Sequence, residues 1–163
     1  MALVFTVLDA SHHDRDGFEC GVAALDDYLR ERAGQHQRDG IATTHVLIDD
    51  AQPARILGYC SLSAAELHLH ELRDEDRKRL PKYPVPAIRV ARLAVAKAEK
   101  GKGHGHLLLG HAVNLALSVR QKMGVRVLIE DAKDARTAAF YEGFGFRRTA
   151  SKALTLYLPI GRS

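Results

Sequence analysis

The chain has 163 residues, 46% hydrophobic and 27% charged, a composition typical of one soluble globular domain over residues 1–163. Long disordered, collagenous and low-complexity chains are excluded by that balance. The 24 basic and 20 acidic residues leave a net charge of +4, which favours acidic partners only weakly. No apolar run is long enough for a membrane span and no export signal is visible. Two cysteines, Cys20 and Cys60, are too few for a disulfide framework, so we expect reduced thiols in the cytoplasm.

Period-two and period-3.6 patterns alternate along the chain and predict a mixed α/β fold. We expect strands over 2–8, 43–48, 56–64, 87–96, 125–130, 145–148 and 153–159. We expect helices from 22 to a fading end within 34–40, over 71–80, from the glycines at 101–105 to about 122, and over 134–142. Residues 49–53 form the turn of a hairpin, the prolines of 81–86 impose a semi-extended connection, and Gly124 suits a left-handed helix cap.

The most informative segment is a strand that runs through a glycine-rich turn directly into a helix. Its turn reads Lys100-Gly101-Lys102-Gly103-His104-Gly105. Alternating glycines remove Cβ atoms, so backbone N–H groups converge on an anion at the positive end of the helix. Lys100, Lys102 and His104 add positive charge. The pattern predicts a phosphate-binding loop, although its spacing is neither GxxxxGKS/T nor GxGxxG and a merely flexible turn is the alternative.

A second candidate segment spans residues 134–146, where a short helix turns tightly into a strand. Tyr141 is a candidate proton donor at this corner. The alternative is an aromatic core cluster, which is the usual fate of such side chains: Phe140, Tyr141, Phe144 and Phe146. On these residues alone the core cluster is the favoured interpretation.

Together, the glycine loop and the run Phe140-Tyr141-Glu142-Gly143-Phe144-Gly145-Phe146 resemble the GNAT acetyltransferase family, whose corresponding segments read (Arg/Gln)-x-x-Gly-x-(Gly/Ala) and Phe-Tyr-Glu-x-x-Gly-Phe. Lysine stands where the family usually has arginine or glutamine, and Asp134 where many members have asparagine. The resemblance implies an α/β (α+β) fold. Its central mixed, mostly antiparallel sheet is splayed into a V between strands 4 and 5 and flanked by helices.

The same resemblance implies roles for individual residues, with acetyl-CoA as the co-substrate. An amine attacks the acetyl carbonyl directly, Tyr141 protonates the departing thiolate, and the backbone N–H of Leu93 is the oxyanion donor. The cofactor contacts are expected at Leu93, Ala94, Val95, Lys100, Gly101, Lys102, Gly103, His104, Gly105, Asp134 and Phe140.

A narrower resemblance is to the GNAT toxins of bacterial toxin–antitoxin pairs. It rests on residues 18–29, on Gly58-Tyr59-Cys60-Ser61-Leu62-Ser63-Ala64, and on residues 80–86 leading into Arg92-Leu93-Ala94-Val95. Such toxins acetylate the free α-amino group of aminoacyl-tRNA, block translation, and are neutralised by a small ribbon-helix-helix antitoxin. This implies tRNA as substrate and the antitoxin as partner, and it allows a homodimer. The alternatives are an N-acetyltransferase for a small amine or protein amino group, and a non-catalytic CoA-binding module.

A tRNA substrate requires basic side chains around the catalytic cleft. The candidates are Arg92, Arg89, Lys82 and Arg38, followed by Arg30, Arg147 and Arg148. For Arg92 the alternative is a structural ion pair with an acid such as Glu66 or Glu130. The nine histidines, above all His68 with His70 on one strand face and His104 with His106 and His111, suggest a metal, but no carboxylate or cysteine completes a zinc pattern. We therefore expect no metal.

Overall fold

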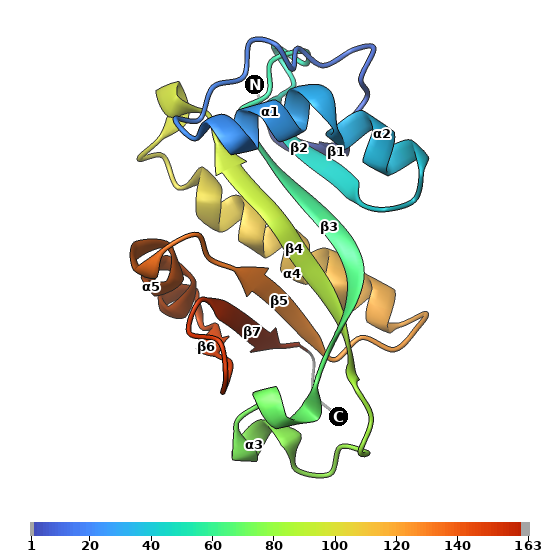
Figure 1. Cartoon of the computed structure of the whole chain (residues 1–163). Coiled ribbons are helices and arrows are strands. Elements are labelled where there is room, and N and C mark those ends of the chain that lie inside the picture. Colours follow the sequence, from blue (N-terminus) through green and yellow to red (C-terminus); the bar gives the residue numbers. More distant parts are fainter. Residues whose placement is uncertain (1, 161–163) are drawn as a thin grey trace. The chain divides into compact units, whose positions relative to one another are not determined.

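The computed structural model describes residues 2–160, and its elements follow the predicted order (Figure 1). The strands are β1 (Leu3–Val7), β2 (Thr43–Asp49), β3 (Gly58–Leu67), β4 (Val85–Val95), β5 (Val127–Asp131), β6 (Arg147–Arg148) and β7 (Thr155–Pro159). The helices are α1 (Ala23–Glu31), α2 (Ala33–Arg38), α3 (Asp74–Arg77), α4 (His104–Arg120) and α5 (Ala135–Phe144), with short 3-10 helices η1 (Leu69–Glu71) and η2 (Lys97–Glu99).

The strands hydrogen-bond in the order β1-β2-β3-β4-β5-β7-β6. Of the described ladders, β1 with β2, β2 with β3, β5 with β7 and β6 with β7 are antiparallel, and β4 with β5 is parallel. This confirms the predicted mixed, mostly antiparallel sheet. The parallel ladder pairs Ala87 with Val127 and ends at Val90 with Glu130, whereas β4 itself continues to Val95. The last five residues of β4 therefore lie beyond the described ladder with β5.

The chain divides into two compact units. One contains Met1–Ser63 and Ala91–Ala112, and the other contains Ala64–Val90 and Val113–Ser163. Strands β3 and β4 and helix α4 each contribute residues to both units. We call them the first and the second unit, and each is described by itself.

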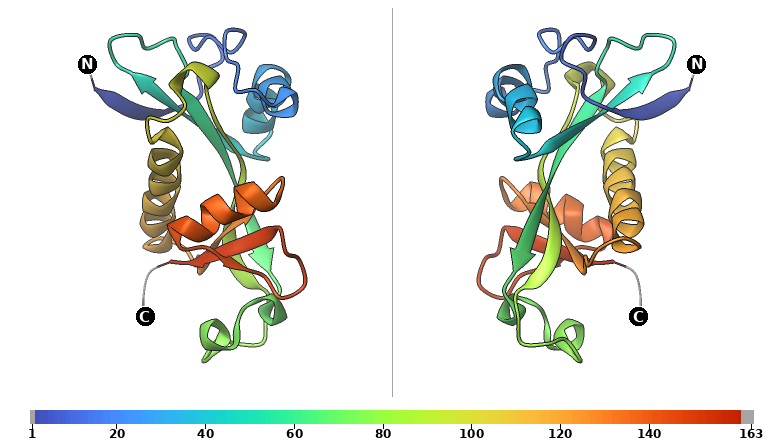
Figure 2. Two further views of the ribbon diagram at one scale, coloured as in Figure 1. Left: turned by 90° about the vertical axis from the view of Figure 1, so that its left-hand side faces the viewer. Right: turned by 90° about the vertical axis from the view of Figure 1, so that its right-hand side faces the viewer.

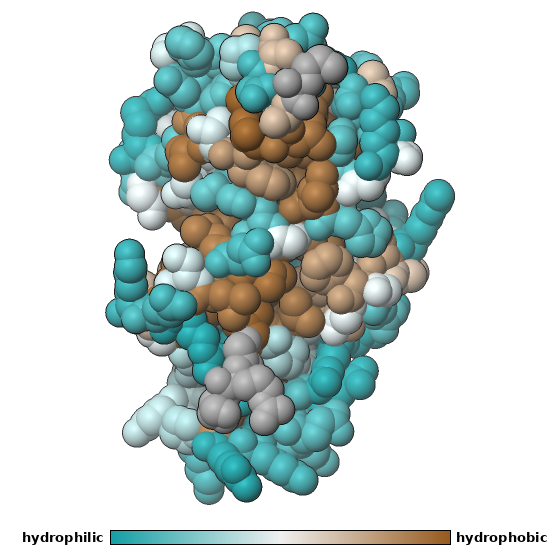
Figure 3. Space-filling model, turned by 180° about the vertical axis from the view of Figure 1, so that it is seen from behind, coloured by the Kyte–Doolittle hydropathy of each residue, from teal (hydrophilic) through white to brown (hydrophobic). Residues whose placement is uncertain are grey.

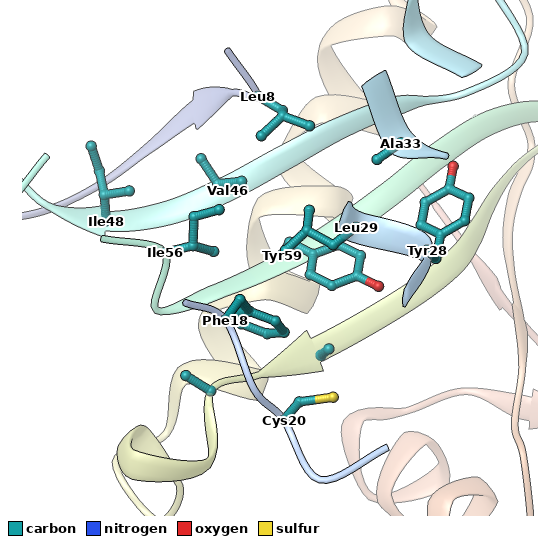
Figure 4. Packing of buried hydrophobic residues seen from close by; sticks show 12 residues of the cluster. Leu8, Phe18, Cys20, Tyr28, Leu29, Ala33, Val46, Ile48, Ile56 and Tyr59 are labelled. Carbon is teal, nitrogen blue, oxygen red and sulfur yellow. The ribbon is translucent and has the colours of Figure 1, made fainter. Parts of the chain in front are cut away.

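The core of the first unit is built around Tyr59 of β3. Side chains from β2, from α1 and from the segment before α1 converge on it, including Val46, Leu29 and Phe18 (Figure 4). The Tyr59 hydroxyl is satisfied because it donates to the backbone oxygen of Leu25 at 2.6 Å. Figure 2 shows α1 and α2 on one face of β1–β3 and the start of α4 on the other. Burying the apolar stripe of a helix on each face is what makes this strand arrangement stable.

The core of the second unit joins β4, β5 and β7. Its fully or nearly fully buried members include Val127, Ile129 and Tyr157. All residues of β5 from Val127 to Glu130 are buried, so this strand lacks the alternation of a half-exposed strand. Tyr157 keeps its hydroxyl satisfied by donating to Asp76 Oδ2 at 2.5 Å.

Three local predictions need correction. The predicted first helix is two helices, because Arg32 leaves helical geometry at φ −124° between α1 and α2. The charged helix expected over 71–80 shrinks to η1 and the four residues of α3. Gly124 is not a left-handed cap, since it is absent from the glycines with positive φ in the described part of the chain. Helix α4 instead ends at Arg120, whose guanidinium donates to the backbone oxygen of Ile160 at 2.6 Å.

Strand β1 is an edge strand that carries exposed apolar side chains. Leu3, Val4 and Val7 are exposed there, and so is Leu107 of α4 in the same unit. Figure 3 shows apolar side chains gathered on the face of the molecule turned away from the viewer of Figure 1. Within residues 2–160, no helix combines the length and apolarity needed to cross a membrane.

Candidate active site

The glycine-rich turn between η2 and α4 belongs to the first unit. Gly101 and Gly103 both have φ +83°, and a Cβ added to either would meet no protein atom within 4 Å. Left-handed backbone disfavours most other residues, so these two positions favour glycine. Gly105 differs because it lies inside α4. The three glycines therefore do not act alike: two shape the turn, and the third belongs to the first turn of the helix, where N–H groups lack intrahelical partners.

A buried glutamate organises the side chains of this turn. Glu99, only 8% exposed, accepts from Arg55 Nη2 at 2.9 Å and from Lys102 Nζ at 3.1 Å, and lies 3.3 Å from His104 Nε2. These partners, Arg55 first, lower the pKa of Glu99 to about 2, so it is ionised. Lys102 and His104 were expected to add positive charge at an anion site, but Glu99 engages both. Lys100 remains exposed.

The second half of β4 also lies in the first unit and is held closely by β3. A Cβ on Gly58 would stand 2.9 Å from the backbone oxygen of Ala94 and 3.0 Å from Leu108 Cδ1. Only glycine allows the two strands to approach this closely. Ala94 is buried, while its neighbours Leu93 and Val95 are half-buried. Close packing against β3 therefore fixes the position of this end of β4.

Tyr141 belongs to the second unit and is positioned by α5. Asp134 caps this helix by accepting from Thr137 N at 2.8 Å, and Gly145 ends it with φ +119°. The Tyr141 side chain is 4% exposed, and its ring lies 5.7 Å from that of Phe146. The aromatic cluster predicted as the alternative is therefore present. The capping bond also gives the Asp134 carboxylate a structural role at the start of the helix.

Tyr141 hydrogen-bonds to a second buried glutamate. Glu130 of β5 is 2% exposed, and its pKa lies well above the ordinary value because burial disfavours the charged form, although the hydrogen bond with Tyr141 opposes this shift. Two buried side-chain polar atoms have no hydrogen-bond partner among residues 2–160: Glu130 Oε2 and His104 Nδ1. His104 belongs to the glycine-rich turn, and Glu130 contacts Tyr141 of the second candidate segment.

Known proteins are similar to this chain in sequence and show its family. The sequence profile of the acetyltransferase (GNAT) domain matches residues 40–148. A tRNA-acetylating toxin of Mycobacterium tuberculosis is 31% identical over 145 residues, covering 89% of this chain and 85% of the relative. The chain belongs to the GNAT acetyltransferase family.

Solved structures share the fold of this acetyltransferase over nearly its whole length. AtaT complexed with acetyl-methionyl-tRNAfMet has a TM-score of 0.91 at 24% identity, covering 97% of this chain and 95% of AtaT. A tyrosine-to-phenylalanine mutant of the AtaT toxin, bound to acetyl-CoA and to the C-terminus of the antitoxin AtaR, has a TM-score of 0.81 at 23% identity. It covers 98% of this chain and 94% of the other. At these identities the likeness is one of fold.

The basic residues expected to bind substrate in this GNAT protein have different surroundings. Arg92 places its guanidinium 3.7 Å from the centre of the Tyr28 ring, a cation–π contact in place of the ion pair considered from sequence. Arg89 forms an ion pair with Asp131, whereas Lys82 and Arg38 are exposed. The secondary candidates pair with acids: Arg30 with Asp27, Arg147 with Asp76, and Arg148 with Glu142.

Four of the histidines form two pairs. His45 Nδ1 lies 3.0 Å from His111 Nε2, and His68 stacks on His70 in and beside η1 rather than on a strand. Among the described residues, no three His, Cys, Asp or Glu side chains are grouped closely enough to hold a metal ion.

Three residues of the candidate site were not predicted from the sequence: Glu99, Arg55 and Glu130. Glu99 stands in a charged run that is typical of solvated surface, and Arg55 is distant in sequence. Glu130 carried a signal, because an acidic residue directly continues the apolar run of β5.

Proposed function

We propose that this acetyltransferase transfers the acetyl group of acetyl-CoA to the α-amino group of an aminoacyl-tRNA and thereby acts as a toxin that blocks translation. Membership of the GNAT family makes acetyl-CoA the co-substrate. The 31% identical relative, named as a tRNA-acetylating toxin, supports the choice of acceptor. The observation that carries the proposal is the turn before α4, where Gly101 and Gly103 adopt left-handed geometry with open space beside them.

The first unit is proposed to bind acetyl-CoA. Backbone N–H groups of the glycine turn and of the first turn of α4 hold the pyrophosphate, because helix N-termini favour anions. The exposed Lys100 adds charge, and the amides of Leu93, Ala94 and Val95 pair with the pantetheine arm. The loop residues proposed for this contact remain Lys100, Gly101, Lys102, Gly103, His104 and Gly105, with Lys102 and His104 acting through the charge network of Glu99.

The chemistry needs an oxyanion donor and a proton donor. As the amine nitrogen bonds to the acetyl carbon, the Leu93 N–H stabilises the carbonyl oxygen. When the C–S bond breaks, Tyr141 gives its proton to the thiolate, a form of general acid catalysis typically worth roughly 10²- to 10⁴-fold. Phe140 packs against Tyr141, with the centres of the two rings 5.3 Å apart. Burial raises the pKa of Cys20 to about 11, which makes it a poor nucleophile and agrees with direct attack.

The partners follow from the same assignment. Lys82 and Arg38, both exposed, are proposed to contact tRNA phosphates. Arg89, which pairs with Asp131, and Arg92, which packs on the Tyr28 ring, are proposed to contact them as well. A ribbon-helix-helix antitoxin is proposed as the protein partner and the cytoplasm as the location. The whole chain is proposed to work as one domain, since the family match spans both units. The exposed apolar edge strand β1 favours a homodimer.

The test is incubation of the protein with radiolabelled acetyl-CoA and a charged tRNA pool, followed by sequencing of the labelled species. We expect label on the amino acid of one or a few aminoacyl-tRNAs, and loss of label with Tyr141→Phe. Label in polyamines or proteins instead of tRNA contradicts the proposed acceptor and favours the small-amine or protein alternative. Acetyl-CoA binding without labelling of any amine favours a non-catalytic module.

A further inference from the structure

Glu130 is a buried acid that nothing in the proposed chemistry has yet used. It lies on β5 opposite Val90 of β4 and Leu156 of β7, and it is 2% exposed. Its Oε2 has no hydrogen-bond partner among residues 2–160. Burying a polar atom without a partner costs folding free energy, and an apolar side chain of similar size avoids that cost. A residue that weakens the core in this way points to a function rather than to packing.

Burial is the main reason why the pKa of Glu130 is raised, and three groups around it modify that effect. Tyr141 reaches it from α5, Asp131 is its neighbour on β5, and Arg89 acts on it from β4. The one cation among them is already engaged, since Arg89 forms an ion pair with Asp131. Desolvation and the nearby charge of Asp131 therefore raise the pKa of Glu130 well above its ordinary value and favour the protonated carboxyl. A protonated carboxyl has one O–H donor as well as acceptor oxygens.

A neutral Glu130 changes what the Tyr141 hydroxyl can do. A phenol that gives up its proton becomes an anion, and this anion is costly at a site as buried as that of Tyr141. An O–H donor beside the phenol oxygen lowers that cost, because hydrogen bonds to charged groups are the strong ones. An ionised carboxylate at the same place has the opposite effect, since it repels the developing charge.

We propose that Glu130 is a positioning residue whose neutral carboxyl donates a hydrogen bond to Tyr141 Oη and stabilises that oxygen while Tyr141 protonates the departing thiolate. This inference rests on the proposed role of Tyr141. The C–S bond breaks with its electron pair going to sulfur, and the phenolic proton moves to sulfur. The acetylated amine loses its extra proton to water, and Tyr141 regains a proton from water. Glu130 keeps its own proton throughout and is not a general base.

Three variants at or near this contact test the proposal in the full-length protein. Glu130→Leu fills the space without a donor and is expected to lower kcat about 10- to 100-fold, while the KM for acetyl-CoA changes less than about twofold. Glu130→Gln keeps an N–H donor and is expected to recover most of that loss. Glu142→Gln changes an exposed acid on the same helix as Tyr141 and serves as the control, with kcat unchanged.

Stability separates this role from a structural one. Glu130→Leu removes the unpartnered oxygen, so we expect its unfolding midpoint in urea to rise although its turnover falls. A residue kept only for packing predicts that stability and turnover fall together. The combination Glu130→Leu with Tyr141→Phe is expected to be no slower than Tyr141→Phe alone, because Glu130 acts through the phenol.

Two results overturn the inference: wild-type kcat in Glu130→Leu, or an equal loss from Glu130→Leu whether residue 141 is Tyr or Phe. Full turnover in Tyr141→Phe overturns it together with the role of Tyr141. The choice of acceptor fails separately. If label appears in another amine instead of tRNA, the same variants are measured with that amine, and their ratios still decide the role of Glu130.

Discussion

Two buried glutamates, one in each unit, have pKa values shifted in opposite directions, which favours opposite charge states for reasons that can be read from their surroundings. Glu99 is surrounded by donors from Arg55, Lys102 and His104, and its pKa falls to about 2. Glu130 meets the Tyr141 hydroxyl inside an apolar core, and its pKa rises. Burial alone therefore does not decide the charge of a carboxyl. The number of cationic donors within reach decides it. Each state suits the proposed role of its residue, because an anion can organise a loop and a neutral acid can donate to a phenol.

The largest expected effect tests the region around Glu130. Tyr141→Phe removes only the hydroxyl from a buried ring, so we expect kcat to fall about 10²- to 10⁴-fold. The KM for acetyl-CoA is expected to stay within about twofold, since cofactor binding is assigned to the first unit. Steady-state acetylation of charged tRNA measures both constants. Equal turnover of the two proteins removes Tyr141 from the chemistry.

The next effect tests the region around Glu99. Gly103→Asp places a carboxylate beside the proposed pyrophosphate site and is expected to abolish acetyl-CoA binding measured by calorimetry. Gly103→Asn is the matched control, because asparagine has a similar shape and also tolerates the left-handed φ of +83°. We expect it to weaken binding far less. Equal affinities for the Asp and Asn variants argue against an anion at this loop.

A smaller effect concerns the charge of Glu99 itself. Because its pKa is lowered, its stabilising contribution is fully present above the ordinary value of 4.5 and is lost as the pH falls through about 2. Arg55→Gln removes the largest cause of that shift, so we expect it to lower the free energy of unfolding by about 1 kcal/mol at pH 7. The difference from wild type should vanish near pH 2. Urea unfolding at both pH values measures this difference, and Lys100→Gln is the control in the same loop. A difference that persists at pH 2 contradicts its assignment to the charge of Glu99.

The smallest effect concerns the helix that carries Tyr141. Asp134→Ala removes the cap of α5 and is expected to cost about 1 kcal/mol of stability, while Asp134→Asn keeps a capping oxygen and costs less. Thermal unfolding measures the difference. If Asp134→Ala instead raises the KM for acetyl-CoA with no change in stability, the side chain contacts the cofactor, as the family resemblance implied.

Much of the fold was predictable from local patterns, and the departures have identifiable causes. The hairpin of β2 and β3, the strand β4 and the helix α4 follow from alternation, turn residues and a continuous apolar stripe. The break at Arg32 did not, because Leu25, Leu29 and Ala33 keep helical spacing across it. The backbone departs from the helix there although the side-chain pattern does not.

The parts of the candidate site that depend on backbone conformation could be predicted from residue type. The charge and surroundings of its buried side chains could not. The left-handed turns at Gly101 and Gly103 follow from glycine, whereas the helical place of Gly105 does not. Glu99 looked like part of a solvated charge run. Its burial depends on Arg55, which is 44 positions away in the chain. Glu130 was considered only as an ion-pair partner, because a single sequence does not reveal that β5 is covered on both faces.

The close approach at Gly58 has a consequence for genetics. No reaction step is assigned to this glycine, yet any side chain there collides with the backbone oxygen of Ala94, on the strand proposed to hold the thioester arm. In a selection for cells that survive expression of the gene, inactivating changes should therefore recur at codon 58 as well as at codons 103 and 141. Even alanine, which adds only a Cβ, is expected to inactivate the enzyme and so to restore growth.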